Sequence, residues 1–316
     1  MSTYSLGIDI GGTTTKFGIV NAKGEILDQD RLPTNQHEVV EDFIEDLYAK
    51  LLPMMDKVGG TKQFVGIGMG APNGNIYSGA IEYAPNLKWK GIIPIAELMQ
   101  KKFNLPTKLT NDANAAAVGE MMYGCAKEMK HFITITLGTG VGSGIVIDGK
   151  IVVGHDGFAG ELGHTIIRPG GRRHKSTGML GSLEAYASAT GVRETAIELL
   201  TKFPEKESLL RDFSIKELTS ETVYDCAIQG DTIANDIFEF TGQILGESLA
   251  NFIMFSSPEA IVLFGGLTKA GAILLNPTRK HMEANLLPIF QNKVKLLFSE
   301  LQEADAAILG ASALIW

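Results

Sequence analysis

Two stretches of the chain share one pattern, which constrains the fold more than any other feature. LGIDIGGTTTKFGIVNAKG, from residue 6, and ITITLGTGVGSGIVIDG, from residue 133, each place an apolar strand, a glycine–threonine turn and a second strand in the same order. Both second strands contain Gly-Ile-Val and lead to a polar hairpin turn. Unrelated hairpins are the plainer alternative, because Gly-rich turns are common, but the identical triplet favours duplication. Duplication predicts two lobes facing each other across a central cleft, where ligands usually bind.

The spacing of apolar residues predicts that strands and helices alternate throughout, so the expected fold class is α/β. Strand-like runs cover residues 4–10, 63–70, 107–110, 131–138 and 260–264, and helical spacing covers 37–58, 93–103, 231–255 and 303–315. No Pro- or Ser-rich linker separates the halves, so we expect a hinge near residue 112. The predicted domains are a smaller N-terminal lobe of residues 1–112, joined by a C-terminal helix at 303–316, and a larger lobe of residues 113–302.

Composition excludes several classes of protein. A formal net charge of −8 argues against general binding of nucleic acid, which needs a basic field. The two cysteines, Cys125 and Cys226, suit a reducing cytosol better than a disulfide framework. The start of the chain does not resemble a signal peptide, and no apolar run reaches the length that spans a membrane. We therefore expect a soluble, cytoplasmic protein.

The two glycine–threonine turns are candidate phosphate sites. GIDIGGTTTK puts Asp9 at the end of a strand, before glycines whose exposed backbone N–H groups can surround an anion. The threonines at positions 13 to 15 add hydroxyl donors, and Asp9 could hold a hydrated Mg²⁺. LGTGVGSG repeats the arrangement. One such turn is weak evidence, whereas two in matched context predict that polyphosphate is held from both sides.

Candidate catalytic and recognition residues follow the strands. In TNDANAA, Asp112 stands between a strand and a helix, where an aspartate most often caps the helix. Opposite two phosphate turns, the same carboxylate could accept a proton from an attacking hydroxyl group. GELGH adds Glu161 and His164, and SLEAYAS adds Glu184. Three polar groups on Gly-rich turns suit recognition of a ligand with many hydroxyl groups.

In this order, GIDIGGTTTK, the ND of TNDANAA, LGTGVGSG, GELGH and GSLEAYASATG resemble the ROK family of sugar kinases, particularly its glucokinases. The resemblance runs from residue 7 to the C-terminus. It implies a duplicated actin-like ATPase fold, related to ribonuclease H, with ATP and Mg²⁺ as cofactors and a hexose 6-hydroxyl as the phosphate acceptor. It also implies that Asp112 is the general base. The sugar ligands that it implies are Asn73, Asn111, Asp112, Glu161, His164 and Glu184. The residues that it implies for the phosphates and nucleoside are Asp9, Gly11, Gly12, Thr13, Thr14, Lys16, Gly138, Thr139, Gly140, Gly265 and Gly266.

The chain departs from this family in HTIIRPGGRRHKSTGMLGSLE, residues 164–184. Many members carry a zinc loop, Cys-x-Cys-Gly-x-x-Gly-Cys-x-Glu, whose fourth ligand is the histidine of the GH motif. Here the cysteine positions hold Lys175, Thr177 and Ser182, which cannot replace three thiolates. We therefore expect no zinc site. The basic cluster from Arg168 to Lys175 is expected to be loop surface that replaced the metal as a scaffold, or to steer an anionic nucleotide.

Other functions within the same family remain alternatives. A kinase of this type could act on mannose, fructose, allose or an N-acetylated hexosamine, because pocket shape distinguishes these sugars. The family also includes sugar-sensing transcriptional regulators, which carry a helix-turn-helix ahead of the kinase-like part. A phosphate motif at residue 7 leaves no room for one in this sequence, and the net charge is unfavourable. The expected partners are a small hexose and a second copy of the chain in a homodimer, with no nucleic acid or membrane. ATP is the expected phosphate donor, with polyphosphate as its alternative.

Overall fold

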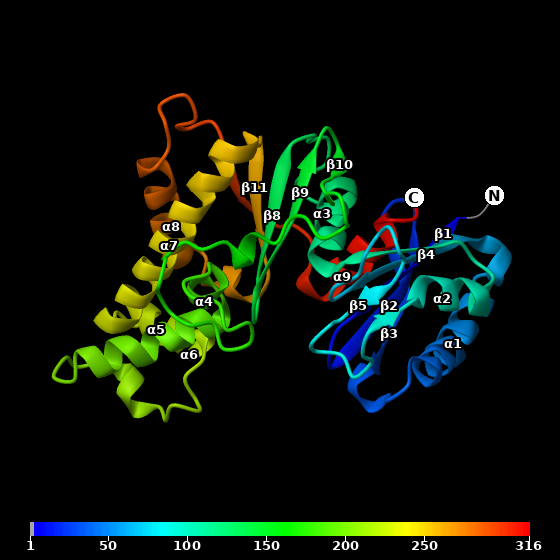
Figure 1. The fold of residues 1–316 in the computed structure, drawn as a ribbon, viewed down its shortest axis with the longest axis horizontal. Coiled ribbons are helices and arrows are strands. Elements are labelled where there is room, and N and C mark those ends of the chain that lie inside the picture. Colours follow the sequence, from blue (N-terminus) through cyan, green and yellow to red (C-terminus); the bar gives the residue numbers. More distant parts are fainter. Residues whose placement is uncertain (1–2) are drawn as a thin grey trace. The chain divides into compact units, whose positions relative to one another are not determined.

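The computed structural model describes residues 3–316, and side chains for all of these except 303 and 304. The chain divides into two compact units (Figure 1). Unit 1 comprises residues 1–130, 144–160 and 299–316, and unit 2 comprises residues 131–143 and 161–298. The helix that begins at Asp112 therefore falls within unit 1, which runs past the expected boundary at residue 112.

Unit 1 is built on the first sheet. Its elements are β1 (Tyr4–Ile10), β2 (Thr14–Asn21), β3 (Ile26–Pro33), η1 (Thr34–Gln36), α1 (Val40–Lys57), η2 (Thr61–Gln63), β4 (Phe64–Ala71), β5 (Ile81–Glu82), β6 (Ile92–Ile93), α2 (Ile95–Phe103), β7 (Thr107–Asn111), α3 (Asp112–Tyr123), β10 (Lys150–Ile151) and α9 (Glu303–Ala313).

Unit 2 is built around the strands of the second sheet. Its elements are β8 (Phe132–Leu137), η3 (Leu162–His164), α4 (Glu184–Ala187), α5 (Ala189–Lys202), η4 (Leu209–Asp212), α6 (Ser220–Ile228), α7 (Thr232–Ser256), β11 (Ala260–Phe264), η5 (Gly266–Ala270), α8 (Ala272–Ala284) and β12 (Lys295–Phe298). The division between the units passes within β9 (Val141–Ile147).

The two sheets have the same strand order. It is β3-β2-β1-β4-β7 in the first sheet and β10-β9-β8-β11-β12 in the second. The two repeated sequence stretches form β1 with β2 and β8 with β9, which occupy equivalent places in the two orders. In each sheet the first strand of the repeat also has a parallel neighbour, which is β4 for β1 and β11 for β8. The predictions of an α/β class and of an internal duplication are confirmed.

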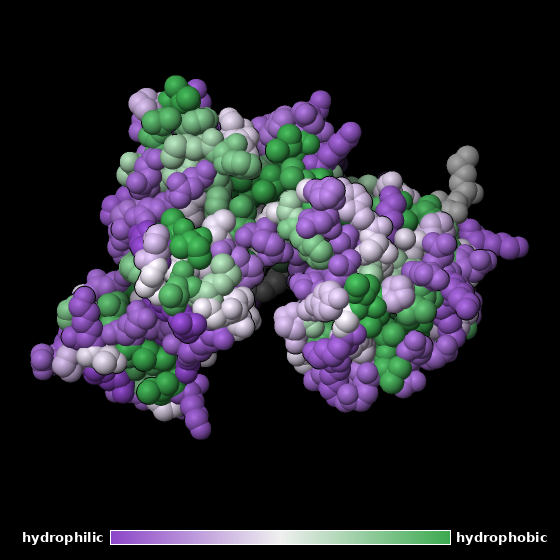
Figure 2. Space-filling view, viewed as in Figure 1, coloured by the Kyte–Doolittle hydropathy of each residue, from purple (hydrophilic) through white to green (hydrophobic). Residues whose placement is uncertain are grey.

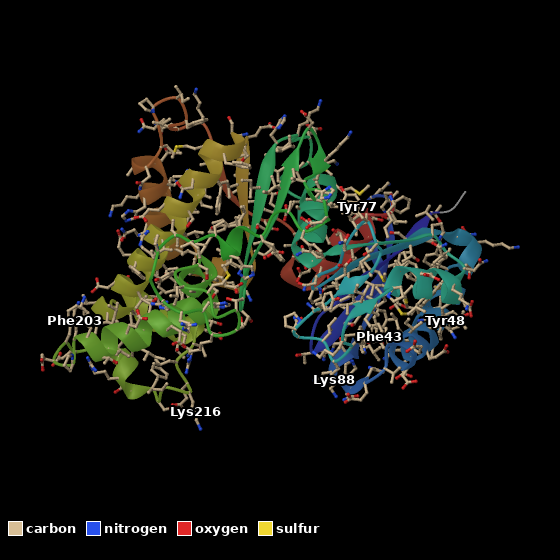
Figure 3. All side chains as sticks on the ribbon, in the orientation of Figure 1. Phe43, Tyr48, Tyr77, Lys88, Phe203 and Lys216 are labelled. Atoms are coloured by element: carbon tan, nitrogen blue, oxygen red, sulfur yellow. The ribbon has the colours of Figure 1, made fainter. Side chains whose placement is uncertain are left out.

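Alternation along β1 gives the first sheet two different faces. Leu6, Ile8 and Ile10 are buried in an apolar core together with residues of α1 and α2. Phe43, which Figure 3 labels, lies in this core, and its ring centroid is 4.8 Å from that of Trp89. The opposite face is flat where α9 crosses it, because a Cβ on Gly7 would lie 2.1 Å from the Ile308 carbonyl oxygen. Asp9 comes two residues after Gly7, so its side chain lies on this second face.

Most apolar side chains lie inside the units. On the face that Figure 2 shows, hydrophilic residues predominate and apolar residues occur in small separate groups. In unit 2 the strands β8 and β11 are almost fully buried, as expected for parallel strands covered on both faces. None of the helices within residues 3–316 is long and apolar enough to cross a membrane.

Candidate active site

Asp9 stands at the carboxyl end of β1, beside two further parallel strands. In the register of the sheet, Asp9 pairs with Gly70 of β4, and Gly70 pairs with Thr110 of β7. The next two residues along the chain after Thr110 are Asn111 and Asp112. Ligands of α/β proteins bind beyond the carboxyl ends of parallel strands, so the sheet itself places these polar residues where a ligand is expected.

Gly70 leaves the space in which two carboxylates approach each other. A Cβ at this position would lie 3.6 Å from Oδ1 of Asp9 and 3.5 Å from Cα of Asp112. Burial, followed by the negative charge of Asp112, raises the pKa of Asp9 to about 7, and Lys16 opposes this rise. Two neighbouring carboxylates, one of which disfavours ionisation of the other, form a set of hard oxygen ligands, which suits Mg²⁺.

Asn111, and not Asp112, caps helix α3. The Asn111 side-chain oxygen accepts the backbone N–H of Asn114 at 2.9 Å, and Asp112 is already the first helical residue. The alternative that Asp112 serves as the N-cap is therefore wrong, because the helix begins one residue earlier than that role requires. Oδ1 of Asp112 instead accepts the N–H of Ala113 at 2.8 Å. Asp112 is an exposed residue, yet desolvation of its carboxyl by the surrounding protein raises the pKa of this group.

The first glycine–threonine turn is a tight connection between β1 and β2. The backbone N–H of Gly11 donates to the carbonyl oxygen of Thr14 at 3.2 Å. A Cβ on Gly12 would lie 2.7 Å from the carbonyl oxygen of Asn86, so this turn packs against the loop before β6. Thr13 is exposed and Thr14 is half-buried, as a phosphate site needs.

Not every threonine of this turn is available to a ligand. The Thr15 hydroxyl is fully buried and lies 2.7 Å from the hydroxyl of Thr34. The expectation that Thr15 adds a hydroxyl donor for a ligand is therefore wrong. Side chains along a strand alternate between the two faces of the sheet, and that of Thr15 lies on a buried face. Lys16 pairs opposite Asp9 in the hairpin, which explains its influence on the Asp9 carboxyl.

Asn73 helps to build the loop that follows β4. Its backbone has a φ of 51°, a left-handed conformation that asparagine adopts more readily than most residues. The side-chain amide nitrogen donates to the Glu82 carbonyl oxygen at 2.9 Å. The half-buried amide therefore has one role in holding the loop, and its oxygen is the atom that could meet a ligand.

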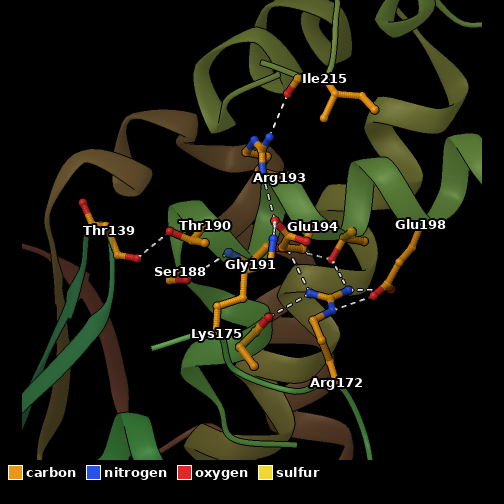
Figure 4. Close-up of polar contacts among 12 residues, drawn as sticks. Thr139, Arg172, Lys175, Ser188, Thr190, Gly191, Arg193, Glu194, Glu198 and Ile215 are labelled. Atoms are coloured by element: carbon orange, nitrogen blue, oxygen red, sulfur yellow. Dashed lines mark hydrogen bonds and ion pairs between the residues drawn. The ribbon is translucent and has the colours of Figure 1, made fainter. Parts of the chain in front are cut away.

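The second glycine–threonine turn, Gly138–Gly140, is fixed to the start of helix α5. The backbone N–H of Ala189 donates to the Gly138 carbonyl oxygen at 2.8 Å. The Thr190 hydroxyl donates to the Thr139 carbonyl oxygen at 3.0 Å (Figure 4). Because these carbonyl oxygens are held by the helix, the turn is positioned independently of any ligand.

The glycines that follow β11 lie beside the second turn. A Cβ on Gly265 would lie 2.6 Å from the carbonyl oxygen of Leu137, the residue before Gly138. Gly265 also has a φ of 104°, which a residue with a side chain rarely adopts. Gly266 then begins η5. The structure therefore brings together Gly138 and Gly265, which are far apart in the sequence.

Glu184 and the GELGH segment converge on the same turn. Oε2 of Glu184 accepts the backbone N–H of Val141 at 2.7 Å. A Cβ on Gly163 would lie 2.0 Å from the Val141 carbonyl oxygen, so the segment lies directly against this backbone. Nε2 of His164 lies 3.7 Å from a carboxylate oxygen of Glu161. Unit 2 therefore gathers all three of its predicted sugar-binding side chains around one turn.

Two buried polar atoms in this region lack hydrogen-bond partners among the described residues. They are Nδ1 of His164 and Oγ of Ser182. In the ROK zinc loop these two positions would hold the histidine ligand and one cysteine ligand. No group of three or more His, Cys, Asp or Glu side chains that could hold a metal occurs in the part of the chain whose side chains are described.

The loop from Thr165 to Leu183 is held by an arginine at its base. The Arg172 guanidinium donates to both carboxylate oxygens of Glu198, at 2.8 and 2.6 Å, and to the carbonyl oxygens of Ala185 and Gly191 (Figure 4). It also lies 4.6 Å from the ring centre of Tyr186. A bidentate guanidinium–carboxylate pair of this kind is among the stronger polar contacts in proteins.

The other basic side chains of the cluster also have partners. Arg168 contacts Glu247, Lys175 donates to Glu194 at 2.7 Å, and Arg173 donates to the carbonyl oxygen of Gly178 at 2.9 Å. These pairs favour the expectation that the basic cluster is a scaffold over the alternative that it steers a nucleotide. His174 is the residue that sequence reasoning undervalued, since its Nε2 lies 3.1 Å from Oε1 of Glu184. A contact across a loop between residues ten positions apart leaves no local signal in the sequence.

The chain is similar to known proteins along its whole length. It matches the model of the ROK family over residues 5–316. A glucokinase of Halalkalibacterium halodurans is 36% identical over 316 residues, covering 99% of this chain and 94% of that protein. A xylose repressor of Bacillus spizizenii is 30% identical over 314 residues, covering 99% of this chain and 77% of the repressor.

A solved structure provides the corresponding comparison of folds. The crystal structure of a ROK family glucokinase from Streptomyces griseus, in complex with glucose and AMPPNP, matches with a TM-score of 0.79 and 30% identity, covering 98% of each chain. This likeness confirms the expected duplicated actin-like ATPase fold. With the repeated sheets, the five motifs in order and the match over residues 5–316, the chain belongs to the ROK family.

Proposed function

We propose that the protein is an ATP-dependent hexose kinase that phosphorylates the 6-hydroxyl of glucose. The observation that carries this proposal is the placement of Asp112 at the carboxyl ends of the parallel strands, relieved of helix capping by Asn111. A kinase needs such a carboxylate to take the proton from the attacking hydroxyl group. The 36% identity to a glucokinase and the likeness to a glucokinase structure with glucose and AMPPNP support this activity and substrate.

Asp112 is the proposed general base. Its Oδ1 is held by the N–H of Ala113, which fixes the orientation of the carboxyl group. The proposed acceptor of the sugar proton is therefore Oδ2. Desolvation raises the pKa of this carboxyl. A general base is more effective when its pKa lies closer to the operating pH.

Two groups of residues are proposed for the phosphates and the nucleoside. The first group is Asp9, Gly11, Gly12, Thr13, Thr14 and Lys16, and the second is Gly138, Thr139, Gly140, Gly265 and Gly266. ATP would supply the phosphoryl group, and Mg²⁺ would neutralise its charge from a position on Asp9 reached through water. The glycine backbones would donate N–H groups to phosphate oxygens, and the two glycines after β11 would lie on the nucleoside side.

The proposed sugar ligands are Asn73, Asn111, Asp112, Glu161, His164 and Glu184. Asn111 uses its side-chain oxygen as the helix cap, so its amide group remains as a donor for a sugar hydroxyl. Removing one partner of a buried hydrogen bond costs about 1–3 kcal/mol. The Glu184→Ala variant should therefore raise the sugar KM far more than the ATP KM, and equal effects on both would point to a structural role.

The proposal is tested by a coupled kinase assay with ATP and a panel of glucose, mannose, fructose, allose and N-acetylated hexosamines. The expected result is the highest kcat/KM with glucose and formation of the 6-phosphate, identified by NMR of the product. A higher kcat/KM for another sugar would assign the protein to a different kinase of the same family. Replacing ATP by polyphosphate tests the donor.

A sugar-responsive regulator is the second candidate, because the chain is 30% identical to a xylose repressor. Such a protein would bind sugar without transferring phosphate. Phosphoryl transfer that is lost in Asp112→Asn would argue against it, whereas calorimetric sugar binding without any turnover would favour it. The net charge of −8 opposes binding to DNA.

We further propose that the protein acts in the cytoplasm as a homodimer. Cys125 and Cys226 are both free thiols, which agrees with a reducing compartment. Light scattering coupled to size-exclusion chromatography would measure the mass directly. A single species of monomer mass at micromolar concentration would contradict the dimer.

A further inference from the structure

His174 lies at the tip of the loop where ROK proteins with zinc hold their metal, and it connects the loop to Glu184. The two side chains are 11% and 13% exposed, and Nε2 of His174 lies 3.1 Å from Oε1 of Glu184. A nearly buried carboxylate needs a donor, because its desolvation is costly when no partner compensates it. His174 provides a basic partner from the loop at ion-pair distance.

The other ring nitrogen of His174 is also occupied. Oγ1 of Thr177 lies 2.9 Å from Nδ1 of His174 and accepts the backbone N–H of Met179 at 3.3 Å. A threonine hydroxyl that accepts from Met179 can donate its own proton to Nδ1. Nδ1 is then the acceptor in the neutral ring, so the imidazole proton is on Nε2, the ring nitrogen that lies 3.1 Å from Oε1 of Glu184.

Glu184 contacts both His174 and the backbone at the second glycine–threonine turn. Its Oε1 faces His174, while its Oε2 accepts the N–H of Val141 at 2.7 Å. A Cβ on Gly140 would lie 2.4 Å from the same Oε2, so the carboxylate is seated directly against the turn. Rotation of the Glu184 carboxylate would therefore disturb both the turn and any ligand that the carboxylate binds.

We propose that His174 is a positioning residue, and that the Thr177–His174–Glu184 chain of polar contacts orients Glu184 in place of a structural zinc ion. This inference rests on the proposed function in one respect, since Glu184 is taken to bind a sugar hydroxyl. Thr177 occupies one of the three family cysteine positions, so a hydroxyl–imidazole–carboxylate chain has replaced a thiolate–metal contact at the same place in the loop.

The first test compares His174→Ala, His174→Gln and Lys175→Ala. Lys175 is the matched control, because it is the next residue of the loop and makes an exposed ion pair with Glu194. His174→Ala should raise the sugar KM by about tenfold to a hundredfold, with a smaller change in kcat and in the ATP KM. His174→Gln should recover much of the loss, since its amide can donate to Glu184. A sugar KM unchanged in His174→Ala would overturn the proposal.

The second test does not depend on any activity. Amide hydrogen exchange at Val141 should be faster in His174→Ala than in the wild type, and unchanged in Lys175→Ala. If His174→Ala does not fold, Thr177→Val keeps the imidazole and should show the same changes to a smaller extent. Faster exchange in a protein that phosphorylates no hexose would support the positioning role and refute the kinase. Unchanged exchange at Val141 in the folded variants would refute the positioning role even in an active kinase.

Discussion

Asp9 and Asp112 are electrostatically coupled across Gly70, which has no side chain to separate them. Burial and then the charge of Asp112 raise the pKa of Asp9 to about 7, while Lys16 lowers it by less. The ligand-free protein therefore holds Asp9 about half protonated at neutral pH. A cation bound beside these two carboxylates would favour the ionised form of both.

This coupling predicts how stability depends on pH in the absence of ligands. A carboxyl group with a raised folded-state pKa contributes stability below its unfolded pKa, near 4, and loses it as pH rises through about 7. The Asp9→Asn variant lacks this loss. Its melting temperature relative to the wild type should therefore increase between pH 4 and pH 8, as measured by differential scanning calorimetry without Mg²⁺ or nucleotide. A difference that stays constant over this range would show that Asp9 does not titrate there.

The Asp112→Asn variant should separate catalysis from folding. Asparagine cannot accept the sugar proton, so turnover should fall by ~10²–10⁴-fold while sugar binding persists. Because Asn111 caps α3, the free energy of unfolding should change by less than about 1 kcal/mol. Asn111→Ala is the matched control, and losing the cap should cost about 0.5–2 kcal/mol of stability. Near-normal kcat in Asp112→Asn would reject the base assignment.

The difference between Asn111 and Asp112 also illustrates what the sequence could and could not predict. The strands, the two glycine–threonine turns and the duplication follow from local patterns, and the structure agrees with them. Asparagine and aspartate are equally good caps, so composition cannot place the first helical residue to within one position. The Arg172 and His174 contacts could not be predicted either, because their partners are brought together by the folding of a long loop.

Ser182→Ala should leave the protein equally stable or make it more stable. The Ser182 hydroxyl is fully buried and has no partner among the described residues, and an unsatisfied buried hydroxyl costs about 1–3 kcal/mol. Removing it relieves that cost at the expense of a very small cavity. Chemical denaturation would measure the change, with Ser188→Ala as the control, because the Ser188 hydroxyl caps α5 and accepts the N–H of Gly191. A clear loss of stability in Ser182→Ala would mean that the hydroxyl has a partner.

The loop also predicts the response to metals. The purified, untagged protein should contain no stoichiometric zinc, and chelators should leave activity intact once Mg²⁺ is restored. A triple variant with cysteine at Lys175, Thr177 and Ser182 should bind about one zinc ion per chain, with His164 as the fourth ligand. Zinc should then restore sugar affinity to a His174→Ala version of this variant. Elemental analysis measures the metal, and one zinc per chain in the wild type would contradict the first expectation.

The discontinuity of unit 1 has a consequence for the order of folding during synthesis. Helix α9 packs on the face of β1 that carries Gly7, yet its residues are translated after all of unit 2. The ribosome therefore releases most of unit 2 while unit 1 still lacks the helix that covers one face of its sheet. N-terminal domains usually fold first on the ribosome. Here the nearly continuous unit 2 can complete its core first, and the half of the chain that begins translation finishes folding last.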